Sequence, residues 1–418
     1  MNNCQVKGIK EMAKDKCVLA YSGGLDTSVC IKWLQDEKNL DVIAVVGEVG
    51  QEHEGLEQVK QRALETGAID CIIADMREDF AADYLSKALY ANANFENKYP
   101  LVSALSRPLI SKYLVDTAHK YGAKYVAHGC TGKGNDQVRF ETSIQALDPT
   151  LEIIAPVREW DMHTRQEEMD WAEAHGVTVP TTKSKPYSID DNLWGRAIEC
   201  GHLEDPWNEP LDDAWVMTKN PEDTPDAPTY TEIEFEAGKP VAVDGKKMKL
   251  SEIVIALNKI SGDNGFGRLD LVEDRLVGLK SRECYEVPGA LTLITAHKAL
   301  EDICVEGDLL KTKIKLEQDW ATAVYNGQWY SPLKNALDAF MADTQKFVTG
   351  TVRLKFFKGN CHVVGRKSPF SLYDYGLATY DRDTTFDEKA SAGFIEIDTL
   401  SLKTWAKVQG PSSAAAQA

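Results

Sequence analysis

The sequence predicts an α/β protein in which an open parallel sheet is followed by a second, α+β domain. Up to about residue 180, short apolar runs alternate with helical patterns. Beyond a loop-rich stretch, the strands instead alternate apolar and polar residues. A chain of 418 residues supports two or three domains. We predict domains over 1–180 and 181–385, and a helical tail over 386–418 whose last residues are disordered.

Five apolar runs in the first part have the length of strands and little alternation, which is typical of strands covered on both faces. They are Cys17–Tyr21, Val42–Val46, Cys71–Ala74, Tyr125–Ala127 and Leu151–Ala155. The clearest helix between them is predicted over 107–121, with Ser106 as its N-cap. Such alternation predicts a parallel sheet with right-handed crossovers, in which ligands lie beyond the carboxyl ends of the strands. The loops after Tyr21, Val46 and Ala127 are therefore the candidate site.

The second part begins with the loop-rich stretches VPTTKSKPYS and NPEDTPDAPTY. TYTEIEFE then alternates in the manner of a half-buried strand, and Asp244–Gly245 predicts a hairpin turn. A helix is predicted over 250–260, and a second hairpin turns at 358–360. These elements predict an α+β second domain.

Composition excludes several classes of protein. The formal net charge is −18, and without a local basic patch such a surface repels nucleic acid. The nine cysteines form no CxxC pair, which argues against a zinc site or a disulfide framework and favours a reducing cytoplasm. No apolar run is long enough to span a bilayer. We expect a cytoplasmic protein without nucleic-acid or membrane partners.

The stretch AYSGGLDTSV follows the first strand and opens a helix. Gly23 and Gly24 let the backbone approach an anion, and Ser22, Thr27 and Ser28 add hydroxyl groups. Neither GxxxxGK[ST] nor GxGxxG is present, so Walker and dinucleotide loops are excluded. The pattern resembles the pyrophosphate (PP) loop of the N-type ATP pyrophosphatases, which cleave ATP between its α and β phosphates. The resemblance implies that the first domain is a nucleotide-binding domain of the PP-loop type.

A second Gly-rich loop, HGCTGKGNDQVRFE, follows the fourth predicted strand. Its glycines permit close approach of a ligand. Its polar side chains supply the donors, the acceptor and the cation that an α-amino acid requires, namely Thr131, Asn135, Asp136 and Arg139.

Together with these loops, the motifs SRPLI, APVREW, YSIDDNLWGR, VEDRLVGLKSRECYE and GRKSPFSLY resemble the argininosuccinate synthase family. The resemblance extends from about residue 17 to about residue 406. It implies an ATP-dependent ligase of arginine biosynthesis that joins L-citrulline to L-aspartate. The products would be argininosuccinate, AMP and pyrophosphate, formed through a citrullyl-adenylate.

The resemblance also implies site residues. Those for ATP are Ala20, Tyr21, Ser22, Gly23, Gly24, Leu25, Asp26, Thr27, Ser28, Gly47 and Gly129. Those for aspartate are Thr131, Asn135 and Asp136. Those for citrulline are Tyr99, Asn135, Arg139, Ser188, Glu273 and Tyr285. Arg139 suits the citrulline carboxylate, and Glu273 suits either its ammonium or its ureido N–H groups.

Catalytic roles are assigned to Ser22 and Asp26 of the first loop. Mg²⁺ is expected with ATP, because the phosphate charges must be neutralised. Asp26 either orients that ion or a loop donor, or it caps the helix. No set of protein metal ligands and no general base is predicted.

Two positions depart from the pattern of some family members. Ala104 and Ala197 stand where those members carry serine, so each loses one hydroxyl group. These two alanines have two interpretations, namely variation within the family or a shifted substrate preference.

Two rival functions are a tRNA-modifying enzyme, which needs a basic face, and an ATP-binding sensor that has lost its chemistry. The family resemblance further implies a homotetramer joined through the C-terminal segment. The apolar residues of 387–408 need burial, either between chains or within one chain.

Overall fold

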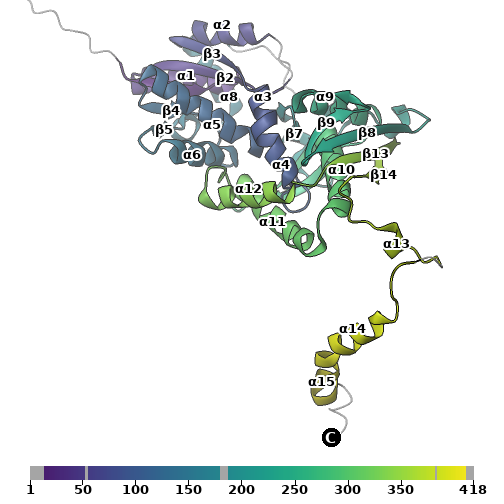
Figure 1. The fold of residues 1–418 in the computed structure, drawn as a ribbon. Helices are drawn as coiled ribbons and strands as arrows, with labels where there is room; N and C mark the ends of the chain where they lie inside the picture. Colours follow the sequence, from purple (N-terminus) through teal and green to yellow (C-terminus); the bar gives the residue numbers. More distant parts are fainter. Residues whose placement is uncertain (1–13, 52–54, 179–186, 382–383, 411–418) are drawn as a thin grey trace, which may run out of the picture. The chain divides into compact units, whose positions relative to one another are not determined.

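The computed structural model describes residues 14–51, 55–178, 187–381 and 384–410. Residues 1–370 and 371–418 form two separately compact units (Figure 1). The first unit contains one parallel and two antiparallel sheets, and the second contains short helices.

The parallel sheet has the strand order β3-β2-β1-β4-β5, with β1 at its centre. In register, Cys17 of β1 lies opposite Val42 of β2 and Tyr125 of β4. The five predicted strands and their parallel pairing are confirmed. Their bounds are β1 Lys16–Ala20, β2 Asp41–Glu48, β3 Asp70–Asp75, β4 Tyr125–Ala127 and β5 Glu152–Ile154.

Helices cover both faces of this sheet, because successive side chains of each strand point to opposite faces. Leu19 packs with α1, α2 and α8, whereas Val18 packs with α5 and α6. The bounds of these helices are α1 Leu25–Lys38, α2 Leu56–Thr66, α5 Val102–Tyr121, α6 Asp136–Leu147 and α8 Arg165–Ala174. Short helical segments complete this part of the chain, namely α3 Arg77–Asp79, η1 Phe80–Leu85, α4 Ser86–Tyr90 and α7 Pro156–Glu159.

The predicted start of the helix over 107–121 is wrong. Helix α5 begins at Val102, and Leu101 in the left-handed region (φ 64°) precedes it. Ser106 lies inside the helix, where its hydroxyl donates to the carbonyl of Ser103. The first turn forms because Val102 and Leu105 are buried in a core, and this packing outweighs the local Ser-Arg-Pro signal.

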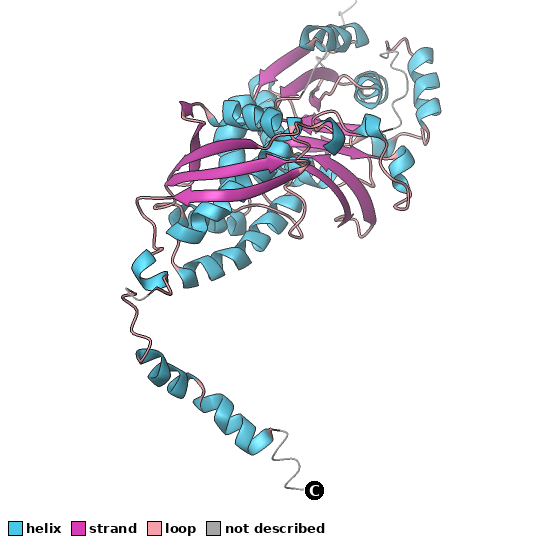
Figure 2. Cartoon of the chain, turned by 90° about the vertical axis from the view of Figure 1, so that its right-hand side faces the viewer, coloured by secondary structure: helices cyan, strands magenta, loops and turns pink. Residues whose placement is uncertain are grey.

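Two antiparallel sheets form the second part of this unit (Figure 2). Their strand orders are β10-β9-β8-β13-β14 and β11-β12-β7-β6. Both predicted hairpin turns are confirmed, since Asp244 and Lys358 adopt positive φ ahead of their glycines. The strands are β6 Ser188–Asn192, β7 Gly195–Glu199, β8 Thr229–Glu236, β9 Lys239–Val243, β10 Lys246–Lys247, β11 Arg268–Asp274, β12 Lys280–Glu286, β13 Gly350–Phe357 and β14 Asn360–Lys367.

Helices of the second part surround these sheets. They are α9 Leu250–Asp263, α10 Pro288–Cys304, α11 Gly307–Tyr325 and α12 Pro332–Thr344, with short turns at η2 Gly201–Glu204, η3 Asp212–Ala214 and η4 Pro221–Asp223. The helix predicted over 250–260 is therefore confirmed as part of α9.

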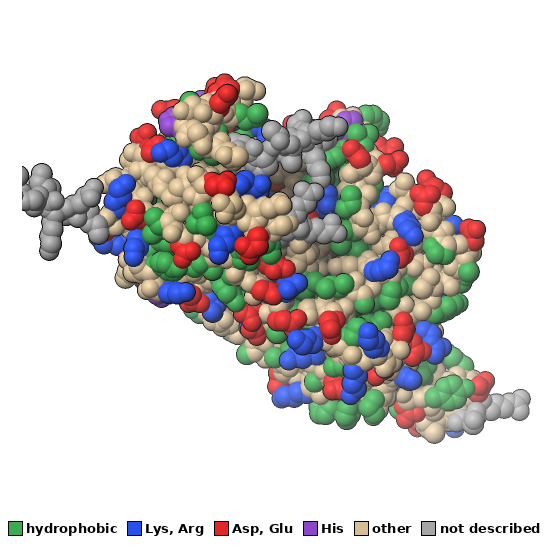
Figure 3. All heavy atoms as spheres, turned by 90° about the horizontal axis from the view of Figure 1, so that it is seen from above, with side chains coloured by type: hydrophobic (Ala, Val, Ile, Leu, Met, Phe, Trp, Pro, Cys, Tyr) green, Lys and Arg blue, Asp and Glu red, His purple; other side chains and the backbone are tan. Residues whose placement is uncertain are grey.

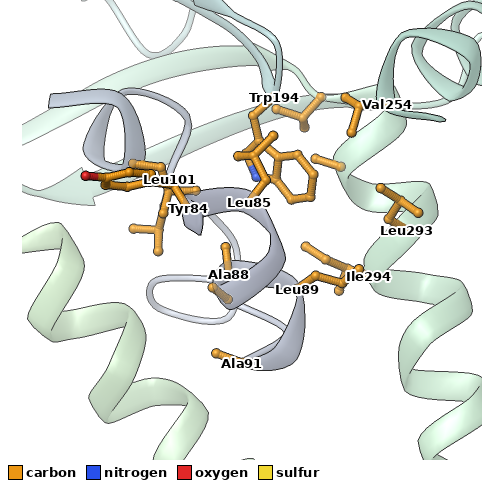
Figure 4. Close-up of a cluster of buried hydrophobic side chains, with 14 of the residues drawn as sticks. Tyr84, Leu85, Ala88, Leu89, Ala91, Leu101, Trp194, Val254, Leu293 and Ile294 are labelled. Carbon is orange, nitrogen blue, oxygen red and sulfur yellow. The ribbon is translucent and has the colours of Figure 1, made fainter. Parts of the chain in front are cut away.

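One core joins the first and second parts of the unit. Leu85 and Leu89, from η1 and α4, pack in the same cluster as Leu293 and Ile294 of α10 (Figure 4). The indole nitrogen of Trp194 donates to the carbonyl of Pro100 at 2.9 Å. This shared packing fixes the two parts against each other, so side chains from both can form the walls of one site. The domain ranges 1–180, 181–385 and 386–418 stay a prediction.

The second unit contains α13 Tyr375–Ala378, α14 Ala390–Asp398 and α15 Leu400–Gln409. Its apolar side chains are exposed, among them Phe394, Ile397, Leu402 and Trp405. The residues predicted to be disordered, 411–418, lie outside the described part of the chain. Within the described ranges, every helix is too short or too polar to serve as a membrane span.

Candidate active site

The first Gly-rich loop joins the carboxyl end of β1 to α1. Gly23 adopts φ +79°, and a Cβ atom there would lie 2.8 Å from Val59 Cγ1, so only glycine fits. The hydroxyls of Ser22 and Thr27 lie 3.0 Å apart, and those of Tyr21 and Ser28 lie 3.1 Å apart. Among the described residues, no side chain caps the N-terminus of α1. Its first N–H groups are therefore available to an anion.

Asp26 lies in the first turn of α1 and is half-buried. Its carboxylate contacts that of Glu168 on α8. Burial, together with the Asp26 carboxylate, raises the pKa of Glu168 to about 8. The raised pKa of Glu168 makes this pair of carboxyl groups a place where added positive charge is favourable.

A cavity of about 250 Å³ opens beside this loop. Its walls come from the ends of β1, β2 and β4, as expected for the carboxyl edge of a parallel sheet. Of the predicted ATP residues, the wall contains Ala20, Tyr21, Ser22, Thr27, Gly47 and Gly129. The other predicted residues, Gly23, Gly24, Leu25, Asp26 and Ser28, belong to the loop and first turn behind this wall.

A second cavity, of about 360 Å³, adjoins the first. Every predicted aspartate and citrulline residue lines it: Tyr99, Thr131, Asn135, Asp136, Arg139, Ser188, Glu273 and Tyr285. Six residues line both cavities, namely Ser22, Arg107, Gly129, Cys130, Asp136 and Asp190. The tertiary structure thus gathers side chains from α5, α6, β6, β11 and β12 at one place.

Asp136 lies between two arginines in this second cavity. Arg107 Nε donates to Asp136 Oδ2 at 2.8 Å, and Arg139 Nη1 donates to Asp136 Oδ1 at 2.9 Å. Burial acts to raise the pKa of Asp136, but the two guanidinium groups outweigh it and hold the pKa below its usual value. Arg107 also pairs with Asp190 at 2.6 Å, so it links α5, α6 and β6.

Arg139 is buried and held by the second part of the chain. Its Nε donates to the carbonyl of Tyr325 at 3.1 Å, and its guanidinium lies 4.9 Å from the centre of the Tyr325 ring. Asn135 Nδ2 donates to the Tyr325 hydroxyl at 2.9 Å. Tyr325, at the end of α11, contacts predicted site residues, and no local sequence signal indicated it.

Glu273 is almost fully buried, at 2% exposure, and accepts hydrogen bonds from the hydroxyls of Tyr285 and Tyr325. Burial and the neighbouring Glu283 carboxylate raise the pKa of Glu273 to about 7, against the lowering effect of the tyrosine hydroxyls. The rings of Tyr99 and Tyr285 stack 4.6 Å apart. The result is an apolar wall with a polar tip, as expected for a ligand with an aliphatic chain.

Several polar residues of the second cavity were missed from sequence. Their side chains come from segments whose partners are distant in the chain: Arg107, Asp190, Glu199, Arg275 and Glu283. The motifs SRPLI, YSIDDNLWGR and VEDRLVGLKSRECYE, which were informative only as a resemblance, contain all of these except Glu199, which follows the second motif. Tyr325, whose hydroxyl accepts from Asn135, was also missed. Of the two alanine departures, Ala197 lines the cavity, whereas Ala104 is buried inside α5.

His128 follows β4 and is buried at the wall of the first cavity. Both of its ring nitrogens are engaged, since Nε2 lies 3.1 Å from Glu141 Oε1 and Nδ1 accepts from the N–H of Cys130. It therefore serves as a packed residue at the strand end. Across the described ranges, no three His, Cys, Asp or Glu side chains are grouped in a way that could hold a metal ion.

Comparison with known proteins agrees with this geometry. Residues 16–178 match the family model described as the argininosuccinate synthase N-terminal HUP domain, and residues 187–405 match that of the C-terminal domain.

Three curated relatives, all named argininosuccinate synthase, match over nearly their full length. The relative from Symbiobacterium thermophilum is 53% identical over 398 residues, covering 95% of this chain and 99% of that protein. The relative from Oceanobacillus iheyensis is 54% identical, covering 96% and 95%. The relative from Geobacillus thermodenitrificans is 55% identical, covering 94% and 96%. The chain belongs to the argininosuccinate synthase family.

Proposed function

We propose that this chain joins L-citrulline to L-aspartate with consumption of ATP, forming argininosuccinate, AMP and pyrophosphate, and that it does so in the two adjoining cavities. The observation that carries the proposal is the shared wall at Arg107 and Asp136. A nucleotide in the first cavity and an amino acid in the second would meet there. The relatives at 53–55% identity support this ligation and its place in arginine biosynthesis.

The first step activates citrulline. Its ureido oxygen attacks the α-phosphorus of ATP, and pyrophosphate departs toward the loop 22–28. The free N–H groups of α1, with the hydroxyls of Ser22 and Thr27, stabilise the departing charge. Activation is needed because a urea carbon is a weak electrophile. Arg107 lies where the two cavities meet and can bind the α-phosphate.

Citrulline is held by groups of the second cavity. Arg139 receives its carboxylate, with Nε and Nη1 kept in place by Tyr325 and Asp136. Glu273 and Ser188 receive its polar N–H groups, and the stacked rings of Tyr99 and Tyr285 pack against its chain. Aspartate is held by Thr131, Asn135 and Asp136. Its amine then attacks the activated carbon, and AMP leaves. Holding three substrates together supplies much of the acceleration.

Mg²⁺ fits this site. Asp26 and Glu168 offer two carboxylates beside the phosphate loop, and their mutual repulsion, seen in the raised pKa of Glu168, is relieved by a divalent cation. When bound, the ion neutralises charge on the phosphates of ATP. We assign Asp26 and Glu168 to this role and Ser22 to binding of the leaving group.

The deciding experiment measures pyrophosphate release from ATP with citrulline alone, aspartate alone, and both. We expect release only in the presence of citrulline, and argininosuccinate once aspartate is added. ATP binding without release in any mixture would contradict the proposal and favour a sensor.

A tRNA-modifying activity is tested by binding to tRNA at low salt. Acidic and basic side chains are interspersed over the face shown in Figure 3. We expect no binding, and a complex that weakens steeply with added salt would revive that alternative.

We further propose a homotetramer in the cytoplasm. Support for assembly comes from the exposed apolar side chains of α14 and α15. Support for a reducing compartment is that the eight cysteines in the described ranges are all free. Light scattering of the purified chain tests the assembly, and a monomeric mass at micromolar concentration would contradict it.

A further inference from the structure

Three glutamates and one arginine line the same part of the chain's second cavity, and the arginine pairs with two of the glutamates. Glu199 ends β7, Glu273 lies on β11 and Glu283 lies on β12, while Arg275 follows β11. We name this set the glutamate cluster.

Arg275 places Glu199 beside the second Gly-rich loop. Its Nη2 donates to Oε2 of Glu199 and to Oε1 of Glu283, the latter at 3.0 Å. Its Nη1 donates to the carbonyl of Lys133 at 3.3 Å. Lys133 lies between Thr131 and Asn135, which hold aspartate in the proposed function. The carboxylate of Glu199 therefore stands on the aspartate side of the cavity.

The Tyr285 hydroxyl lies within hydrogen-bonding distance of two carboxyl groups of the cluster. The Tyr285 hydroxyl contacts Glu273 Oε1 and also lies 2.6 Å from Glu283 Oε2. A hydroxyl has one proton and can donate to only one of these oxygens. The other contact is a hydrogen bond only when that carboxyl group carries a proton itself. The cluster therefore brings together more carboxylate oxygens than the tyrosine hydroxyl can satisfy.

Among the carboxylates of the second cavity, Glu199 is the one best suited to accept a proton. Asp136 is paired with two arginines, and Asp190 accepts from both Arg107 and Ser103. Glu273 is occupied by two hydroxyls and is almost fully buried. Glu199 is one third exposed. In the described part of the chain, hydrogen bonds engage only its Oε2 side-chain oxygen.

The electrostatic surroundings of Glu199 agree with this choice. Burial, then the Glu283 carboxylate, raise its pKa to about 7, while Arg275 acts in the opposite direction and Asp136 adds to the rise. A base that titrates near neutral pH is the most effective at neutral pH.

The ligation step demands such a base, because aspartate arrives as an ammonium ion that has no lone pair for attack. We propose that Glu199 is the general base that deprotonates the amino group of aspartate, with Arg275 as the residue that positions it. The inference rests on the proposed function and names a catalytic residue within it.

One N–H bond of the ammonium breaks, its electron pair stays on nitrogen, and the proton passes to a carboxylate oxygen of Glu199. The nitrogen pair then forms the new C–N bond to the activated carbon of the citrullyl-adenylate. The C–O bond to AMP breaks, and its electron pair leaves on the phosphate oxygen.

The test separates the two half-reactions in Glu199→Gln. Adenylation is followed as pyrophosphate release from ATP with citrulline alone, and ligation as argininosuccinate formed after aspartate is added. We expect adenylation within about threefold of the unaltered enzyme and ligation slowed by about a hundredfold to ten-thousandfold, the usual contribution of a general base. Glu199→Asp, which keeps a carboxylate, should recover part of the ligation rate.

The pH dependence supplies a readout that a merely structural role would not affect. In the unaltered enzyme, kcat/KM for aspartate should fall as pH drops through about 7. This decrease of kcat/KM at low pH should be absent from Glu199→Gln. The exposed Glu204→Gln is the matched control and should behave like the unaltered enzyme in both half-reactions.

Three results would overturn the inference: normal ligation in Glu199→Gln, equal loss of both half-reactions in a variant with unchanged unfolding temperature, or a raised KM for citrulline as the main effect. Absence of pyrophosphate release from the unaltered enzyme would instead refute the proposed function, so the two failures are distinguishable.

Discussion

Two glutamates of this protein are buried to nearly the same degree, yet their pKa values shift in opposite directions. Glu301 of α10 and Glu273 of β11 are 1% and 2% exposed. Burial acts to raise the pKa of Glu301, but His297 and Lys313 outweigh it and the net shift is downward. The pKa of Glu273 rises to about 7. Burial alone therefore does not decide the charge of a buried carboxyl group.

The neighbours of Glu301 form a closed cluster, consisting of Asn92, His297, Glu301, Lys313, Glu317 and Gln345. Lys313 Nζ lies 3.1 Å from Glu301 and 2.6 Å from Glu317. The amides of Asn92 and Gln345 donate to the carboxylates and present their oxygens to the two ring nitrogens of His297. Because these groups are engaged with one another and shielded from water, removing one partner would leave a buried charge unpaired.

The glutamate cluster differs because Arg275 pairs there with both Glu199 and Glu283, and these side chains line a cavity. Its uncompensated charge and spare hydrogen-bonding groups are left for ligands. The comparison teaches that a closed charged cluster engages its charges within the protein, whereas an open one leaves groups available for binding and proton transfer.

Among variants that test this comparison, the largest effect is expected from Asp136→Asn, which removes the charge paired with Arg107 and Arg139. Loss of two charge-assisted hydrogen bonds of ~2 kcal/mol each predicts argininosuccinate formation slower by about a thousandfold. Steady-state rates measure this. The control is Asp116→Asn, whose side chain is exposed in an i,i+4 pair with Lys112. An Asp136→Asn rate within tenfold of the unaltered enzyme would argue against that role.

Lys313→Met tests the closed cluster. It leaves Glu301 and Glu317 without their common cation, and breaking a buried pair in this way costs about 3–5 kcal/mol of unfolding free energy. Denaturant unfolding measures the loss, while the rate per folded molecule should stay unchanged. Lys311→Met, two residues earlier in α11 and paired only at the surface, should change stability by less than about 0.5 kcal/mol. Equal losses in both variants would refute the distinction between closed and surface charges.

In contrast to Lys313→Met, Glu273→Gln should raise the stability of the fold above neutral pH. The folded state raises the pKa of Glu273 from its ordinary 4.5 to about 7, so it binds the proton more tightly than the unfolded chain does. Its contribution to stability is present below pH 4.5 and is lost as pH rises through 7. At pH 8, Glu273→Gln should therefore be more stable by about 1–3 kcal/mol, with little difference at pH 4.5. Unfolding at the two pH values measures this.

The same variant should bind citrulline more weakly, because it loses the carboxylate. A raised KM for citrulline together with raised stability would show that the open cluster is maintained for binding. Lower stability at both pH values would contradict the assignment of an uncompensated charge.

The smallest effect is expected from Ala197→Ser, which adds a hydroxyl to the wall of the open cavity. We expect a change of at most about threefold in KM for citrulline, since one added hydrogen bond contributes ~1 kcal/mol or less after water is displaced. Ala104→Ser adds the same group inside α5 and should leave this KM unchanged while lowering the unfolding temperature slightly. A change in KM from Ala104→Ser alone would reverse the two assignments.

Much of the fold was predictable because its signals are local. The five parallel strands were evident from short apolar runs, and both hairpin turns from a positive-φ residue next to glycine. The start of α5 was not, because a Ser-Arg-Pro sequence favours a helix start at Ser106, while burial of Val102 and Leu105 extends the helix by a turn. Local propensity yields to tertiary packing in such cases.

The candidate site likewise contains residues that local sequence indicated and residues that only tertiary packing brings together. The residues of the two Gly-rich loops are contiguous and carry their chemistry in the sequence. Tyr325 joins Asn135, Arg139 and Glu273 by hydrogen bonds, yet it lies at the end of a helix whose pattern reports only a buried face. Arg275, which follows β11, pairs with Glu199 at the end of β7. Strand β12 lies between these two strands in the sheet, and no spacing in the chain indicates that the two side chains are in contact.

By itself, the sequence determined the parallel sheet, the anion-binding loop after β1 and the amino-acid donors after β4, because each depends on neighbouring residues. Only the tertiary structure decided that the two cavities share Arg107 and Asp136, that Glu199 stands beside the Gly-rich loop, and that the pKa of Glu273 rises whereas that of Glu301 falls. The reason is physical. The pKa of a carboxyl group depends on the charges and donors that packing brings within a few ångströms, and those come from distant parts of the chain.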